Sequence, residues 1–227
     1  MRICLFLIAI TALHCAKPCP VDINLGDLKL DPSSVAFIPA VQQVKTIKFR
    51  NGTGQKMEFT NASIGEGLKF FELPVETLCQ RGDFVDKTAQ TVFFKADQYN
   101  IYYQSDNLQY TLSLNLQPEN AGIYGSRNDT IFYEVLGMAG QKIPAPAQVG
   151  SMHILTSERG NTAKISDNIR QNNNQYELLP DTTILGRNIK NAYVTPKNGQ
   201  HTLFIFYTKL NGFEAFTTAG GEQWVRE

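Results

Sequence analysis

This chain of 227 residues has no excess of positive or negative charge, and catalytic motifs and long apolar runs are scarce in it. Lys and Arg number 21, and so do Asp and Glu, which gives a formal net charge of zero without a basic stripe. A basic stripe is the electrostatic footprint of nucleic-acid binding, so we expect no nucleic-acid partner. The chain also lacks a Gly-x-Ser-x-Gly elbow, a His-Glu-x-x-His pair and a phosphate-binding glycine loop. No motif therefore names a reaction.

Histidine is scarce as well, and this bears on metal chemistry. Beyond the first twenty residues only His153 and His201 occur, and neither has a second histidine at ligand spacing. We therefore expect no metal and no cofactor.

The carboxylates Glu66, Glu72 and Glu76 could serve a polysaccharide hydrolase, but only if two of them came within about 5–5.5 Å across a cleft. Enzymatic activity stays undecided, and the sequence leans against it.

The longest apolar run lies at the start of the chain. Ile3–Leu13 follows Arg2 and has the length of a signal-peptide core, well short of the roughly 20 residues that span a bilayer. Cys15 follows after His14, at the position where a bacterial lipoprotein receives its lipid. The segment predicts export, with a lipid anchor at Cys15 in the outer membrane. Conventional cleavage after Ala12 or Ala16 is the alternative and would give a periplasmic or secreted soluble protein.

Two of the four cysteines lie beyond this segment. In an oxidising compartment Cys19 and Cys79 could form a disulfide. Closing a loop of about sixty residues would stabilise the fold by roughly 4 kcal/mol at most. Free thiols are the alternative, because Cys19 lies in a proline-containing tether.

Alternating β patterns fill most of the remaining chain. Ile47 and Phe49 alternate with charged residues before Asn51-Gly52, which is typical of a hairpin with one buried face. Residues 99–104 and 108–116 predict a second hairpin. Residues 201–224 predict a closing hairpin around Asn211-Gly212 that carries Trp224 back onto its own strands. Helical periodicity persists nowhere for the eleven residues that an amphipathic helix needs.

These patterns predict an all-β fold with an antiparallel, sandwich-like architecture in two lobes; a small β-barrel is the alternative. The prolines near residue 145 favour a linker between the lobes. The predicted organisation is a signal at 1–15, a tether and first strand at 16–40, a β-sandwich-like domain at 41–139, a linker at 140–150 and a C-terminal β domain at 151–227.

Four tyrosines on one predicted hairpin form the candidate binding surface: Tyr99, Tyr102, Tyr103 and Tyr110. Tyrosines on a solvated sheet face can stack on sugar rings or pack against a partner protein. The alternative is that they cap the core as cross-strand pairs. Tyr102 and Tyr103 are adjacent and must face opposite sides of the sheet, so at least one should point outward.

The chain ends resemble those of uncharacterised secreted β-rich lipoproteins of the Bacteroidota. The resemblance is carried by a cysteine after a short signal, by the hairpin at Ile47–Gly52, and by an ending with Tyr207-Thr208-Lys209, Gly212–Phe216 and Gly221–Trp224. It implies an envelope location and brings no activity or ligand with it. The resulting hypothesis is a non-enzymatic cell-envelope lipoprotein that binds a protein or a glycan, with the membrane contacted only through the anchor.

Overall fold

The fold is all-β, and the all-β prediction is confirmed. The computed structural model describes residues 21, 23–39, 45–81, 84–122, 131–143, 147–160 and 162–227, without the side chains of residues 62–92 and of a few single positions. The described strands are β1 (Ile23–Leu28), β2 (Thr46–Asn51), β3 (Lys56–Arg81), β4 (Phe84–Ser105), β5 (Tyr110–Gly122), β6 (Ile131–Lys142), β7 (Gln148–Arg159), β8 (Glu177–Ile184), β9 (Arg187–Val194), β10 (Leu203–Thr208), β11 (Gly212–Thr218) and β12 (Gln223–Arg226). The described helical segments are α2 (Pro32–Val35), α3 (Asp167–Asn172) and the 3-10 turn η3 (Thr162–Lys164).

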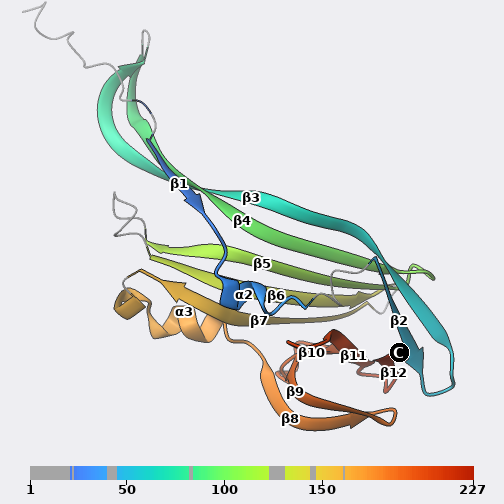
Figure 1. The fold of residues 1–227 in the computed structure, drawn as a ribbon. Helices are drawn as coiled ribbons and strands as arrows, with labels where there is room; N and C mark the ends of the chain where they lie inside the picture. The colour runs from blue at the N-terminus through green and yellow to red at the C-terminus, as the bar shows by residue number, and fades with distance from the viewer. Residues whose placement is uncertain are drawn as a thin grey trace, which may run out of the picture.

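One antiparallel sheet contains eleven of these strands, in the order β7-β6-β5-β4-β3-β2-β12-β11-β10-β9-β8, while β1 lies off this path and pairs with β4 in parallel. The eleven strands curl through 285° into a half-barrel (Figure 1). The predicted two-sheet architecture is therefore corrected to one curled sheet, nearer to the barrel alternative. The reason is a long-range pairing: Trp224 of β12 pairs with Asn51 of β2, which joins strands β2–β7 and strands β8–β12 in one sheet.

The segment predicted as a linker carries strand residues on both sides. Residues 140–142 belong to β6 and residues 148–150 to β7, and Gly140 pairs with Gly150. Residues 144–146, which hold the prolines, lie outside the described residues. Hairpin pairing between β6 and β7 therefore continues up to the proline segment from both sides.

Two glycines let the curled sheet close on itself. A Cβ at Gly150 would overlap the carbonyl oxygen of Leu203, and one at Gly140 would lie 2.8 Å from the Leu203 Cδ2 atom. Because neither position carries a side chain, β10 can pack directly on β6 and β7. Thr202 then donates its backbone N–H to the Val149 carbonyl (2.9 Å), and Val149 donates its own to Thr202 Oγ1 (3.1 Å).

The main core lies on the inner face of the half-barrel and is rich in aromatic rings. The rings of Phe216 and Trp224 stack at 6.1 Å on neighbouring strands, as the closing hairpin predicted. On the other side of β10–β12, the β8–β9 hairpin adds a second, smaller core, which contains Ile189, Phe206 and Val225. Strands β10 and β11 are thus buried on both faces, which explains the apolar run Leu203–Tyr207 of β10.

The segment that holds α2 packs against the inner core. Asp31 caps the short helix, and its backbone N–H donates to both carboxylate oxygens of Glu134 on β6 (3.0 and 3.1 Å). Phe37 and Ile38 follow and are buried in the main core. Far from this segment, β3 and β4 continue as a long hairpin beyond the other strands (Figure 1).

Candidate ligand-binding groove

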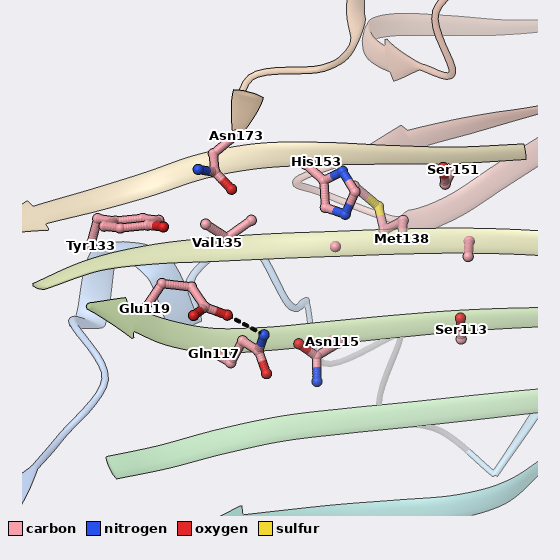
Figure 2. Close-up of a pocket in the computed structure, with 12 residues that line it drawn as sticks. Ser113, Asn115, Gln117, Glu119, Tyr133, Val135, Met138, Ser151, His153 and Asn173 are labelled. Atoms are coloured by element: carbon pink, nitrogen blue, oxygen red, sulfur yellow. Dashed lines mark hydrogen bonds between the residues drawn. The ribbon is translucent and has the colours of Figure 1, made fainter. Parts of the chain in front are cut away.

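Two hollows of about 340 and 430 Å³ lie on the outer face of β5, β6 and β7. They adjoin one another, because Ser113, Ala139 and Ser151 line both. We call the whole feature the outer groove. Its amide end contains Asn115, Gln117, Glu119, Tyr133, His153 and Asn173 (Figure 2). Its tyrosine end contains Tyr102, Thr111, Gln141, Val149, Gln200 and His201.

Strand register explains why the surface is hollow at this place. Ser113, Ala139 and Ser151 lie in one row across the three strands. In the next row, Gly137 lies between Asn115 and His153. Because side chains alternate along a strand, the leucines between these β5 positions point into the core and leave only small or polar groups outside. The rows of small side chains form the floor, and the larger polar groups form the walls.

The wall beside α3 is held in place by backbone and side-chain bonds. His153 and Gln175 exchange two backbone hydrogen bonds, at 2.9 and 3.2 Å. Arg170 on α3 donates to both carboxylate oxygens of Glu158 on β7, at 2.7 and 3.0 Å. This fork geometry gives the ion pair a fixed direction. It positions Asn173, just after α3, at the rim of the groove (Figure 2).

The amide end is polar, and its two perturbed groups are neutral near pH 7. Burial raises the pKa of the Tyr133 phenol, and the negative charge of Glu119 adds to the effect, against a hydrogen bond with Asn173. Burial lowers the pKa of the His153 imidazole. The Asn115 amide donates to Asn100, and the Gln117 amide donates to Glu119. Since each amide has both donors and acceptors, the end can exchange hydrogen bonds of both kinds with a ligand.

The tyrosine end offers apolar surface next to polar groups. The Tyr102 side chain is 38% exposed and that of Val149 is 46% exposed. Gln200 and His201 come from the loop before β10, and the Thr202–Val149 bonds hold this loop against β7. The two ends therefore differ in emphasis: Asn115, Gln117 and Asn173 gather at the amide end, whereas the tyrosine end adds the exposed ring of Tyr102.

Of the four predicted tyrosines, only Tyr102 lies on this surface. Tyr103 and Tyr110 are 0% and 1% exposed and belong to the main core, and Tyr99 packs partly buried against it. The candidate surface is corrected accordingly, because three of its members point inward. The prediction that Tyr102 and Tyr103 face opposite sides is confirmed.

Tyr110 has a structural partner instead of a ligand. Its hydroxyl donates to Glu222 Oε2 (2.7 Å), which also accepts from Lys142 (2.6 Å). Burial raises the Tyr110 pKa to about 12. Trp224 Nε1 donates to the other Glu222 oxygen (3.0 Å), so the carboxylate ties β5, β6 and β12 together.

Several predicted residues are not tested by the structure. Cys15 and Cys19 lie outside the described residues, and Cys79 belongs to β3 with a side chain outside them, so the lipid anchor and the disulfide stay predictions. The candidate carboxylates Glu66, Glu72 and Glu76 also belong to β3, where a loop was expected, and their side chains are likewise not described.

In the described part, no three His, Cys, Asp or Glu side chains gather as a metal site would need. The described helices are all too short or too polar to cross a bilayer.

The groove contains residues that sequence reasoning passed over. The two histidines looked like isolated strand-end residues, yet His153 and His201 lie at opposite ends of one groove. On β5, Ser113, Asn115 and Gln117 alternate with leucines in the sequence, and this alternation is a local signal that they share one face of the strand. Nothing local in the sequence indicated that β7, α3 and the loop before β10 would build walls around them.

Comparisons with protein-family models, with curated proteins and with solved structures each found no match for this chain.

Proposed function

We propose that this protein is an exported, non-enzymatic cell-envelope protein that binds a glycan in the outer groove. The observation that carries the proposal is the lining of the amide end, where Asn115, Gln117 and Asn173 surround a floor of small residues. Sugar hydroxyls both donate and accept hydrogen bonds. An amide side chain can pair with both, because its carbonyl oxygen accepts and its NH2 group donates. No Lys or Arg is among the described residues that line the groove, which suits a ligand without phosphate or sulfate groups.

The position of the groove favours a glycan over a peptide. Peptides that add a strand bind at a sheet edge, where backbone groups are open. The outer groove instead lies on a sheet face. Two of its strands, β5 and β6, already pair on either side, and β7 is the last strand of the order and pairs with β6. Binding there depends on side chains, and the side chains available are mainly amides, hydroxyls and tyrosine rings.

The envelope location rests on the sequence. An apolar signal core at Ile3–Leu13 and a following Cys15 support export with a lipid anchor. The resemblance to secreted lipoproteins of the Bacteroidota points the same way. A soluble periplasmic or secreted form is the alternative, and the mass of the mature protein separates the two, because acylation of Cys15 adds a lipid-sized increment.

A polysaccharide hydrolase is the alternative activity. A retaining enzyme needs two carboxyl groups about 5–5.5 Å apart. Among the described groove residues Glu119 is the one carboxylate, so binding is the function that the groove supports better. Release of shortened products from a bound glycan would favour the hydrolase.

The test is a glycan array followed by titration calorimetry. We expect the wild-type protein to bind a glycan free of phosphate and sulfate groups. Asn115→Ala should weaken that binding about tenfold, as losing about 1.4 kcal/mol of hydrogen bonding would. Thr183→Ala, an exposed change on β8, is the matched control and should leave affinity unchanged. An array without binding, or an Asn115→Ala variant with wild-type affinity, would refute the proposal.

A further inference from the structure

We propose that the ligand is an extended oligosaccharide that occupies both ends of the outer groove, with Tyr102 as the platform on which one sugar ring stacks. This inference rests on the proposed function and deepens it. It concerns the size of the ligand and the way it lies in the groove.

The length of the groove is the first argument. On β5 its lining runs from Thr111 to Glu119, which is eight residue steps. At about 3.3 Å per step this amounts to roughly 26 Å. A single sugar ring is several times shorter, so one ring would leave most of the lining without contacts.

The continuity of the floor is the second argument. Ser113, Ala139 and Ser151 line both hollows, and no large side chain stands in this row between the two ends. Gly137 continues the low floor into the amide end. A chain-like ligand could therefore lie across the row without a break.

Tyr102 provides the third argument, because its environment differs from that of the core tyrosines. Tyr110, Tyr193 and Tyr207 each pack a ring against another aromatic ring, whereas Tyr102 has no such partner among the described residues. Its partner on β5 is the small Ser113, which does not cover the ring. An exposed ring beside an open floor suits stacking on the apolar face of a sugar.

The two ends should therefore contribute differently to affinity. The amide end should hold one part of the chain through hydrogen bonds whatever its length. Tyr102 should add affinity only when the chain is long enough to reach it. Ligand length and the Tyr102 side chain should thus show coupled effects.

The experiment is titration calorimetry with two series of probes, cello-oligosaccharides and chito-oligosaccharides, each from the disaccharide to the hexasaccharide. We expect wild-type affinity to rise about tenfold or more along a series and then to level off. Tyr102→Ala should lower affinity for the hexasaccharide about tenfold and leave that for the disaccharide unchanged. Tyr102→Phe should keep the wild-type pattern. Leu178→Ala, an exposed apolar change on β8, is the control and should change nothing.

Three results would overturn the inference: affinity independent of length, an equal effect of Tyr102→Ala on short and long probes, or no binding by either series. The glycan array used to test the proposed function distinguishes failure of the extended-ligand inference from failure of the function itself. Binding of a monosaccharide or of a compact glycan there would retain the function and reject the extended ligand.

Discussion

The inner and outer faces of β4–β7 are made by alternate residues of the same strands, yet their chemistry is opposite. The inner face carries large apolar groups such as Tyr103 and Leu114, exposed by 0% and 1%. The outer face carries Tyr102, Ser113 and other small or polar groups that line the groove. Because the side-chain period is two, a shift of one position moves a residue from stabilising the fold to contacting a ligand. Neighbouring residues can therefore test the two roles separately.

The largest difference should appear between Tyr103 and Tyr102. Tyr103→Ala removes a fully buried ring and should destabilise the protein by about 3–5 kcal/mol. Tyr102→Ala removes a ring that is 38% exposed and should stay within about 0.5 kcal/mol of wild type. Urea unfolding of both variants measures this. Similar losses for the two substitutions would contradict the separation of the faces.

Glu134 sharpens the comparison because it is a carboxylate on the inner side of β6. It is 0% exposed, forms an ion pair with Arg159, and accepts the Asp31 backbone N–H. Glu134→Ala should leave Arg159 without this partner, which costs about 3–5 kcal/mol in fully buried pairs. We expect about 2–4 kcal/mol, since the Arg159 side chain is 26% exposed and water can compensate part of the loss.

Thermal unfolding of Glu134→Ala beside Glu58→Ala gives the measurement and its control. Glu58 also forms an ion pair, with Lys48, but both side chains are largely in solvent, at 44% and 58% exposure. An exposed pair of this kind contributes about 0–1 kcal/mol. Equal effects at the two sites would show that burial does not set the strength of these pairs.

Two glycines on opposite faces offer a third contrast. Gly150→Ala would drive a Cβ into the Leu203 backbone and force β10 away from β7, at a cost of about 1–3 kcal/mol or somewhat more. Gly137→Ala would place its Cβ 3.4 Å from the His153 ring, an ordinary contact on the groove side, and should change stability little. Urea unfolding reports both effects. In calorimetry, Gly137→Ala should weaken glycan binding while the fold stays intact, because it raises the floor.

Local features of this fold follow from the sequence, and long-range ones do not. The hairpins at Asn51-Gly52 and Asn211-Gly212 were predictable because turn residues and strand alternation are local signals. The pairing of Trp224 with Asn51 joins segments far apart in the chain, and no pattern within either segment specifies the other. This pairing is what turns two expected lobes into one curled sheet.

The groove was predictable only in part, for a related reason. Alternation identified the outward residues of β5, and the adjacency of Tyr102 and Tyr103 identified an outward tyrosine. His153 belongs to β7 itself, and His201 reaches the same groove because Gly140 and Gly150 allow β10 to approach β7. Glycine in a strand signals close packing without saying against which element.

The smallest effect should be a pH dependence that arises at the groove itself. Burial lowers the pKa of His153 below its ordinary value of 6.5 in the folded protein. As the pH falls below about 6.5, the unfolded chain takes up this proton before the folded chain does, so folding stability decreases. The decrease ends once the pH has passed below the folded-state pKa. Glu158 has a pKa lowered by its hydrogen bond from Arg170, so it titrates below its ordinary 4.5, outside this range.

Urea unfolding of wild type and of His153→Gln, at pH values of about 7.5 and 5.5, isolates this contribution. Since glutamine does not titrate, the variant should lose less stability than wild type between the two pH values. NMR titration of the imidazole gives the folded-state pKa directly and should find it below 6.5.

Glycan affinity should fall over the same pH range. Protonation converts the acceptor nitrogen of the His153 ring into a donor at the amide end. An imidazole that titrates at or above 6.5 would show that the walls of the groove do not bury it, and the contrast between this partly buried ring and the exposed ring of Tyr102 would then be lost.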